Sequence, residues 1–296
     1  MLINSFLYIK AVFTTGLKFT KMHGIGNDYI YFDCFKEKVT EPERLAQRIS
    51  DRRFGVGGDG IVLIMPSECA DFRMRMFNLD GSEGKMCGNA TRCIGKYVYD
   101  RGLTDKTEIT LETLSGIKKL KLHVENGKVK TVSVDMGKAE LRAAKIPVVS
   151  STETVIGEQR FVAGGESVIT CVSMGNPHCV VFTDGIDDID LEKVGPKFEN
   201  DPIFPDRVNT EFVETSGCNT LRMRVWERGS GETWACGTGA CAVCVAAAEN
   251  GLVPRDTDVT VKLRGGDLTV NYHKDGTVIM TGPAQFVFDG ELCSEE

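Results

Sequence analysis

The sequence predicts an α+β protein built from two pseudo-symmetric repeats, each a mostly antiparallel sheet wrapped around a buried central helix. Three observations predict this fold. Related residues recur at a constant offset of 149 positions. Short apolar segments alternate with turn signals in both halves, which is typical of strands. Each half also has one strong helical segment that directly follows a cysteine. We expect the active site in the cleft between the repeats.

The repeat is collinear over about 100 residues without an insertion. The matched positions are Gly26-Asn27 with Gly175-Asn176, Glu83 with Glu232, Cys87-Gly88 with Cys236-Gly237, Gly102-Leu103 with Gly251-Leu252, and Gly127 with Gly276. One matched dipeptide arises by chance, but such an ordered series indicates duplication. We expect an N-terminal extension over 1–16, an N-terminal domain over 17–134 plus 282–296, and a C-terminal domain over 135–281.

Strands and helices follow from local patterns in each half. Apolar segments predict strands around 61–64, 109–111, 120–122, 129–134 and 268–270. Asn126-Gly127 and Asp275-Gly276 lie between such segments and predict hairpins. The helices are expected over 88–100 and 237–249, each ended by the glycine that follows, Gly102 or Gly251. The second helix is apolar nearly all round, so it should be buried.

Composition excludes several classes of protein. The chain has 296 residues, 42% of them apolar and 26% charged, with a formal net charge of −7. An acidic chain of this kind argues against nucleic-acid binding, and no segment approaches the length of a membrane span. The apolar start of the chain carries its only charge, Lys10, inside the apolar run, which favours an extra strand or start-site extension over a secretory signal. The odd number of cysteines, 11, indicates a reduced cytoplasmic protein.

Two cysteines lie where a thiol would be reactive. Cys87 and Cys236 each precede a predicted helix and are followed by small residues. A helix N-terminus favours the thiolate, and its free N–H groups can bind an anion. Two equivalent bases on opposite faces of one carbon suit racemisation, in which one group starts as thiolate and the other as thiol. No Schiff-base lysine context or phosphate cup is evident, so we expect no cofactor and no metal.

Several segments together resemble the diaminopimelate epimerase family. They are KMHGIGNDY (21–29), FNLDGSEGKMCGNATRC (77–93), MGNPHC (174–179), ERGSGETWACGTGACA (227–242) and TGPA (281–284), in the family's order and spacing. The resemblance covers the chain from about residue 17 to its end. It implies two domains of like fold, a homodimer, no cofactor, and conversion of LL- to meso-diaminopimelate in lysine and peptidoglycan precursor biosynthesis.

The resemblance also implies the roles of individual residues. Cys87 and Cys236 correspond to the proton donor and acceptor. The carboxylate at the reacting centre would be held by Gly88, Asn89, Gly237 and Thr238. Further substrate contacts would come from Asn27, Asn78, Asn176, Asn209, Glu227 and Arg228. His178 and Glu227 would adjust the two thiols. An arginine can bind the substrate's distal carboxylate with two parallel hydrogen bonds.

The chain departs from the family pattern at two positions and leaves some alternatives open. Many members carry Gln where this chain has Gly60, and Gly where it has Ala90; the latter change should be harmless in a helix. A related racemase acting on proline, hydroxyproline or histidine would share the cysteines but should lack the set for a distal amino-acid group, which is the Glu227-Arg228 pair and the four asparagines. A non-catalytic or redox protein with paired thiols is the alternative from another class.

Two further motifs in the sequence are weak. Gly55-x-Gly57-x-x-Gly60 lacks the preceding strand and following helix that a dinucleotide site needs. Cys241 and Cys244 resemble half of a zinc site but lie within an apolar helix, with no second pair of matching spacing.

Overall fold

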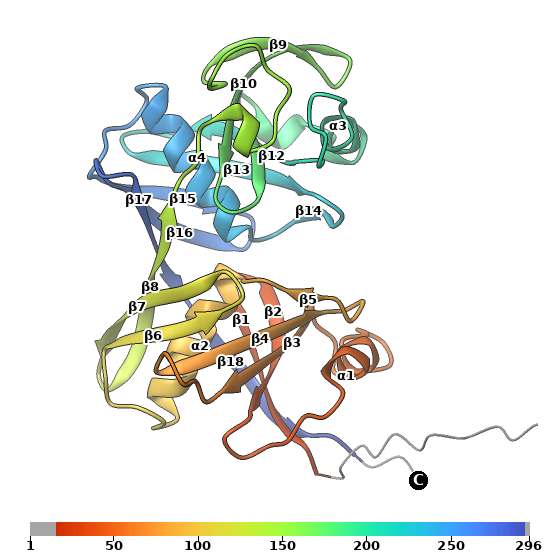
Figure 1. Ribbon diagram of the computed structural model, residues 1–296, viewed down its shortest axis with the longest axis vertical. Coiled ribbons are helices and arrows are strands. Elements are labelled where there is room, and N and C mark those ends of the chain that lie inside the picture. The colour runs from red at the N-terminus through yellow and green to blue at the C-terminus, as the bar shows by residue number, and fades with distance from the viewer. Residues whose placement is uncertain (1–15, 294–296) are drawn as a thin grey trace, which may run out of the picture.

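The computed structural model describes residues 16–293, so the extension expected over 1–16 falls outside the described residues except for Gly16. The chain forms two lobes stacked along the long axis of the molecule (Figure 1). The N-terminal lobe contains residues coloured red to yellow, and the C-terminal lobe those coloured green to blue. The last strand returns to the N-terminal lobe. That lobe therefore contains both the first and the last strand of the chain.

Strands dominate both lobes. The N-terminal lobe contains β1 (Lys18–Gly24), β2 (Asn27–Asp33), α1 (Pro42–Ile49), β3 (Gly60–Met65), β4 (Phe72–Asn78), β5 (Glu83–Gly84), α2 (Gly88–Asp100), β6 (Glu108–Thr113), β7 (Gly116–Glu125), β8 (Lys128–Lys138) and β18 (Gln285–Glu291). The C-terminal lobe contains η1 (Ala143–Lys145), β9 (Glu158–Val162), β10 (Gly165–Ser173), β11 (Pro177–Phe182), η2 (Ile186–Asp188), α3 (Leu191–Glu199), β12 (Asn209–Thr215), β13 (Thr220–Glu227), β14 (Gly231–Thr233), α4 (Gly237–Glu249), β15 (Asp258–Leu263), β16 (Gly266–Tyr272) and β17 (Thr277–Pro283).

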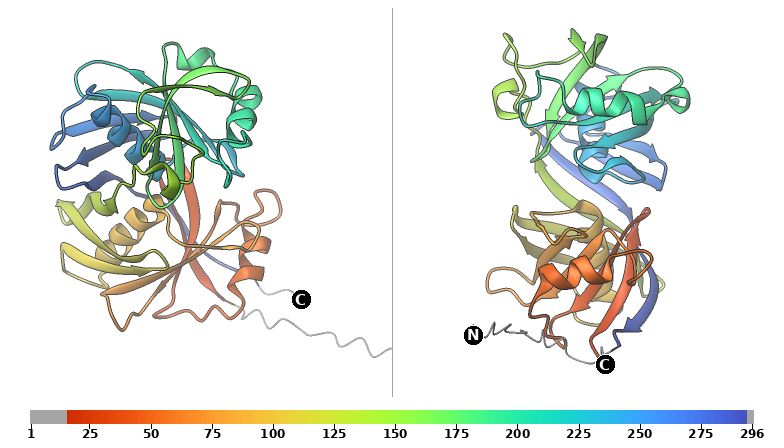
Figure 2. Two further views of the ribbon diagram at one scale, coloured as in Figure 1. Left: turned by 45° about the horizontal axis from the view of Figure 1, so that its top comes forward. Right: turned by 90° about the vertical axis from the view of Figure 1, so that its right-hand side faces the viewer.

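The strands pair mostly in antiparallel fashion, as predicted. The parallel pairs among the described strands are β2–β3, β4–β6, β11–β12 and β13–β15. Strands β8 and β17 pair antiparallel and join the two lobes, and Figure 2 shows the strands that cross between the lobes. The prediction of a sheet-dominated α+β fold is confirmed.

Both predicted long helices form between the predicted residues. Helix α2 packs against β1, β7 and β8, and α4 packs against strands from β10 to β12 and from β15 to β17. Gly102 and Gly251 follow these helices with φ of 75° and 72°, a conformation that glycine adopts without a Cβ penalty. Ten of the residues of α4, from Gly237 to Ala247, are buried, as its apolar composition predicts. Helices α1 and α3 were not predicted from the sequence.

The predicted strands and hairpins are also present. Each predicted apolar segment lies within β3, β6, β7, β8 or β16. Asn126 and Gly127 have φ of 50° and 73° and join β7 to β8 in a tight turn. The second hairpin, between β16 and β17, has a longer turn, because its last cross-strand pair is Tyr272 with Val278. Among residues 16–293, no helix combines the length and apolar character that crossing a membrane requires.

Gly60 occupies a position that only glycine fits. Its φ is 154°, and a Cβ atom there would lie 2.0 Å from the Phe77 carbonyl oxygen and 2.9 Å from Cε1 of Tyr29. The neighbouring strand and the Tyr29 ring therefore leave no room for a side chain. This backbone accounts for the departure at Gly60, since the glutamine found in many family members could not enter it without a shift of β3 or β4.

We expect Gly60→Ala to lower the free energy of unfolding by at least about 1–3 kcal/mol, the usual cost of a strained backbone position. Chemical denaturation measures the change. Gly165→Ala is the matched control, because a Cβ at Gly165 would have no neighbour within 4 Å. Equal stability of the two variants would show that β3 and β4 can shift to accommodate a Cβ at position 60 without a measurable cost.

Candidate active site

Cys87 lies immediately before α2 with an extended backbone, φ −134° and ψ 120°. This conformation leaves the first N–H groups of the helix free of intrahelical partners. Its Sγ donates to Oδ1 of Asn27 at 3.4 Å. The other end of that amide donates to Oδ2 of Asp59 at 2.7 Å, which fixes which end faces the thiol. Asp59 thus orients Asn27, a role that no motif in the sequence indicated.

Cys236 occupies the same position before α4, with φ −113° and ψ 105°. Its Sγ accepts a hydrogen bond from the Gly239 N–H at 3.3 Å and lies 3.6 Å from Oγ1 of Thr238. The side chain is buried, with 4% of its surface exposed. Cys236 therefore contacts the first turn of its helix directly, as the sequence predicts for an N-terminal thiol.

The pKa values of both thiols are raised, although a position at a helix N-terminus by itself would lower them. Burial raises the pKa of the Cys87 thiol, and backbone N–H groups of Ala90 and Asn89 offset part of that rise. Burial, followed by the Glu227 and Glu211 carboxylates, raises the pKa of Cys236 well above its usual range. The expected lowering by the helix N-termini is present but smaller than the desolvation of the thiolate. The Glu227 carboxylate adds to the rise in pKa of both thiols.

The starts of α2 and α4 lie against each other. The Asn89 side chain donates from Nδ2 to the carbonyl oxygen of Ala235, which directly precedes Cys236, at 3.1 Å. Cβ atoms placed on Gly88 and Gly237 would both meet the Met280 side chain, at 2.8 and 3.2 Å. Glycine at both positions thus allows the two helix starts to converge on Met280. The structure brings together the residues expected to bind the reacting carboxylate.

Hydrogen bonds connect a series of polar side chains to Thr238, which lies beside Cys236. Nδ1 of His178 is 2.7 Å from Oε1 of Glu211, and both side chains are fully buried. Nε2 of His178 lies 3.1 Å from Oδ1 of Asn176, whose Nδ2 donates to Oγ1 of Thr238 at 3.3 Å. Glu211 was not predicted; it lies on β12 two residues after Asn209, within a strand that reads as ordinary core. The hydrogen-bond chain connects His178 to the residue beside the Cys236 thiol.

Glu227 is the last residue of β13, and Arg228 begins the turn that follows. Asn209 accepts from the Arg228 backbone N–H at 2.8 Å, and Glu199 accepts from the Gly229 N–H at 2.9 Å. Thr233 donates to Glu227 through its hydroxyl. Burial raises the pKa of Glu227, and its interaction with Thr233 lowers it in part. Glu199, at the end of α3, was missed because its position in the sequence gives no sign of this contact.

The side chains of two predicted residues point to partners outside this network. Nδ2 of Asn78 donates to Oγ of Ser82 at 3.0 Å, and Asn78 pairs with Gly60 across β3 and β4. The Arg228 guanidinium donates from Nη1 to the carbonyl oxygen of Asp206 at 2.7 Å. No hydrogen bond within residues 16–293 joins either side chain to Cys87 or Cys236. Their predicted substrate contacts stay predictions.

Comparison with known sequences decides the family. A sequence model described as diaminopimelate epimerase matches residues 19–142 and 170–287, more than half of the chain. The chain is 57% identical to the diaminopimelate epimerase of Acetivibrio thermocellus over 281 residues, covering 95% of this chain and 100% of that protein. It is 55% identical to that of Methanococcus maripaludis, covering 93% and 99%. The chain belongs to the diaminopimelate epimerase family.

Membership of the diaminopimelate epimerase family makes the protein an isomerase. Solved structures support the fold alone. A phenazine biosynthesis protein of the PhzF family from Bacillus anthracis has 18% identity and a TM-score of 0.68, covering 95% of this chain and 100% of that one. A hydroxyproline epimerase from Agrobacterium vitis has 14% identity and a TM-score of 0.67, covering 95% and 93%. The same fold therefore occurs in proteins that are described as having different functions, so the likeness supports the fold and not the activity.

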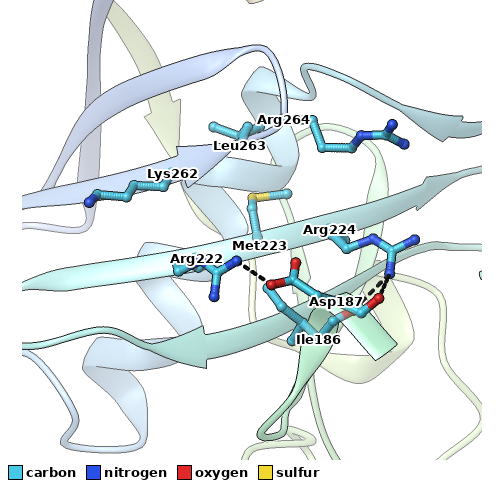
Figure 3. A pocket seen from close by; sticks show the side chains of 8 residues that line it. All are labelled: Ile186, Asp187, Arg222, Met223, Arg224, Lys262, Leu263 and Arg264. Atoms are coloured by element: carbon cyan, nitrogen blue, oxygen red, sulfur yellow. Dashed lines mark hydrogen bonds and ion pairs between the residues drawn. The ribbon is translucent and has the colours of Figure 1, made fainter. Parts of the chain in front are cut away.

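A cavity of about 340 Å³ lies elsewhere on the C-terminal lobe, among η2, β13 and β15. Figure 3 shows its arginines and Asp187. Arg222 pairs with Asp187 at 2.7 Å, and Arg224 and Arg264 pair with Glu232 at 2.9 and 3.1 Å. Because carboxylates already neutralise these arginines and no predicted epimerase residue lines the cavity, we do not assign the active site to it.

Proposed function

We propose that the protein interconverts LL- and meso-diaminopimelate by a two-base mechanism in which Cys87 and Cys236 act on opposite faces of one α-carbon. One sulfur, as thiolate, takes the α-proton, and the electron pair of the C–H bond remains on the substrate. The other sulfur, as thiol, gives its proton to the opposite face. The observation that carries this proposal is the convergence of two cysteine-led helix starts, linked by the hydrogen bond from Asn89 to Ala235.

The helix starts also suit stabilisation of the charge that develops on the substrate. Backbone N–H groups at Gly88, Asn89, Gly237 and Thr238, which have no partner within their helices, can donate to the α-carboxylate, which gains negative charge as the proton leaves. Fixed dipoles in a buried site are effective because they need no reorganisation during the reaction. Asn27, Asn176 and Asn209 are then available for the rest of the substrate, with Glu227 and Arg228 at its distal end.

We infer that the two lobes derive from one duplicated unit, with domains over 17–134 plus 282–296 and over 135–281. Helices α2 and α4 have 13 residues each and begin 149 positions apart. The strand pair β4–β5 contains the ion pair Arg75–Glu83, and β13–β14 contains Arg224–Glu232 at the same offset. A duplicated unit gives two opposed bases without further design, which supports the two-base proposal.

Substrate choice tests the proposal against the related racemases. We expect the purified protein to invert LL-diaminopimelate and to leave L-proline, trans-4-hydroxy-L-proline and L-histidine unchanged under the same conditions, because only the first has a distal amino-acid group for the Glu227–Arg228 turn. Circular dichroism or chiral chromatography measures the inversion. Inversion of proline at a comparable rate would contradict the substrate assignment while keeping the two-cysteine mechanism.

We expect kcat/KM to increase from pH 7 to pH 9. The active form needs one thiolate, and burial raises the pKa of both thiols from an ordinary value of 9.0. A raised pKa keeps a thiol protonated at lower pH, so the active form grows as the pH rises. kcat/KM should decline only at still higher pH, where the second thiol also loses its proton. That pH is higher because the pKa of Cys236 is raised further than that of Cys87. A pH series with unfolding controls measures the profile; kcat/KM falling over this interval would contradict it.

We expect the reaction to need neither metal nor organic cofactor. Among residues 16–293, no three His, Cys, Asp or Glu side chains gather closely enough to hold a metal ion. The proposed chemistry needs only the two sulfurs and the hydrogen-bond donors of the site. A chelator should leave the rate unchanged; loss of activity that returns on adding a divalent metal would refute this prediction.

We also propose a homodimer in a reducing cytoplasmic setting. All eleven cysteines are free, which suits a catalytic thiol pair. Within the described residues, β18 pairs only with β1 and exposes Val287 and Phe288, by 53% and 47%. An edge strand with exposed apolar side chains is a surface on which a second copy could pack. Light scattering measures the mass; a monomer at micromolar concentration would contradict the dimer.

A further inference from the structure

Glu199, the last residue of α3, is a buried carboxylate on which three segments of the C-terminal lobe converge. Its side chain is 8% exposed. Oε2 accepts a hydrogen bond from the indole Nε1 of Trp226, on β13, at 2.7 Å. Oε1 accepts from the Gly229 backbone N–H, in the turn after β13, and from Nη1 of Arg207, in the loop before β12, both at 2.9 Å. One carboxylate therefore joins a strand, a turn and a loop.

Two of these contacts lie on either side of Arg228. Gly229 directly follows Arg228 in the chain, so the carboxylate holds the backbone next to it. Arg207 directly follows Asp206, whose carbonyl oxygen accepts from Nη1 of Arg228 at 2.7 Å. Glu199 thus holds both the turn that carries Arg228 and the loop that receives its guanidinium.

Close packing fixes the position of α3 and, with it, of the carboxylate. A Cβ on Gly195, inside α3, would lie 2.2 Å from Cδ2 of the Trp226 ring. Glycine weakens a helix interior, and its use here allows the helix to lie directly against the indole. The Trp226 side chain is buried between α3 and the turn that contains Gly231. The Trp226 indole therefore both contacts α3 and donates to the carboxylate at its end.

The guanidinium of Arg228 keeps one forked edge available. Its Nη1 donates to the Asp206 carbonyl, and within residues 16–293 neither Nε nor Nη2 makes a hydrogen bond or ion pair. Arg224 shows what that edge can bind, since its Nε and Nη2 donate to the two oxygens of Glu232 at 2.9 and 3.1 Å. A substrate carboxylate can meet Arg228 in the same way.

The N-terminal lobe lacks this arrangement, although it has the same elements. Helix α1 begins at Pro42 and α3 at Leu191, 149 positions later, and β4 and β13 end at the same offset (Figure 1). At that offset the two lobes differ in the residues concerned: Ser50, Phe77 and Leu79 stand where the C-terminal lobe has Glu199, Trp226 and Arg228. Phenylalanine and leucine side chains donate no hydrogen bond. The fold common to both lobes therefore does not require the carboxylate or the arginine.

An arrangement confined to one lobe suits a substrate that is held at one end. In the proposed mechanism the reacting carbon lies between two equivalent cysteines, one from each lobe. The distal amino-acid group of diaminopimelate extends beyond that carbon, so a single lobe can hold it. The lobe that carries Arg228 also carries the buried carboxylate, which associates Glu199 with the distal end of the substrate.

We propose that Glu199 is a positioning residue for substrate specificity, which holds Arg228 so that the forked edge of its guanidinium faces the distal carboxylate. The inference rests on the distal role proposed above for Arg228. Glu199 itself touches neither the substrate nor the reacting carbon. Its effect should therefore appear in substrate binding and should disappear when Arg228 is absent.

Steady-state kinetics with LL-diaminopimelate tests the proposal in Glu199→Gln, Arg228→Ala and the double variant. Whichever way a glutamine turns, its amide N–H₂ faces one of the three donors, so a buried donor loses its acceptor. We expect KM to rise about tenfold in Glu199→Gln, with kcat changed by less than about twofold, which is the pattern of lost substrate binding. The double variant should be no worse than Arg228→Ala alone, because Glu199 acts only through Arg228.

Two further variants accompany this series, and thermal unfolding checks the fold of each. Arg207→Met removes one donor to Oε1 and should raise KM about two- to threefold; the Arg207 side chain is 54% exposed, so the fold should tolerate its loss. Glu192→Gln is the matched control, because Glu192 is exposed on the same helix. It should leave both kcat and KM unchanged.

An unchanged KM in folded Glu199→Gln would overturn the positioning role. So would a lower kcat at unchanged KM, or losses that add in the double variant, because Glu199 would then act independently of Arg228. If Glu199→Gln does not fold, Arg207→Met decides, and an unchanged KM there would overturn the inference. Unchanged kinetics in Arg228→Ala would instead overturn the distal role of Arg228 in the proposed function.

Discussion

Cys87→Ala and Cys236→Ala are each expected to reduce epimerisation of diaminopimelate to below about a hundredth of the original rate while leaving the fold intact. Removing an essential acid or base normally costs about 10²–10⁴-fold. In the proposed mechanism neither thiol can replace the other, because each would act on one face of the α-carbon from its own helix start. The measurement is kcat with LL-diaminopimelate, accompanied by thermal unfolding of each variant.

Cys218→Ala is the control for the loss of a thiol as such. Cys218 is exposed in the β12–β13 turn, so its removal should change neither the rate nor the stability. If either active-site variant kept more than about a hundredth of the rate, the two-base mechanism would be wrong, because an essential acid or base would be present elsewhere.

Arg228→Ala is expected to lower kcat/KM for diaminopimelate by about two to three orders of magnitude. In the proposed binding mode backbone N–H groups hold the α-carboxylate, so the distal carboxylate is left for a side chain. Leaving a buried carboxylate without its partner costs about 3–5 kcal/mol. Arg228→Lys should be a poor rescue, because lysine offers a point charge in place of a planar fork.

A substrate analogue that lacks the distal carboxylate is the control for Arg228. The loss in Arg228→Ala should be far smaller with this analogue than with diaminopimelate. In the structure the guanidinium donates to the Asp206 carbonyl, a contact that would also serve to brace its own loop. Equal losses on both substrates would establish that bracing role and remove the main residue-level support for distal recognition.

The fold could be predicted where a local pattern carries the information. Helix α4 is apolar on all sides and ends at a glycine, and the Asn126-Gly127 turn adopts the positive φ values that such a dipeptide favours. Helices α1 and α3 were missed because they are short, with 8 and 9 residues, and their stability comes from packing on strands rather than from sequence periodicity.

The site could also be predicted only where a local sequence pattern marks the residue. Cys87 and Cys236 stand out because they precede helices at equivalent positions. Their pKa values could not be predicted, since the helix effect and burial oppose each other and only the structure shows that burial is larger. Glu211 was missed because it lies in a segment that reads as core, and a buried charge is recognised only when its partners are known.

Isotope incorporation tests the central claim most directly. LL-diaminopimelate is incubated with the protein in deuterium oxide, and the early product and the recovered substrate are analysed by mass spectrometry. Two bases on opposite faces predict meso-diaminopimelate with one deuterium at the inverted carbon, formed while the recovered LL-isomer still carries none. Deuterium appearing in the recovered substrate as fast as in the product would indicate a single base, and absence of inversion would contradict the proposed activity itself.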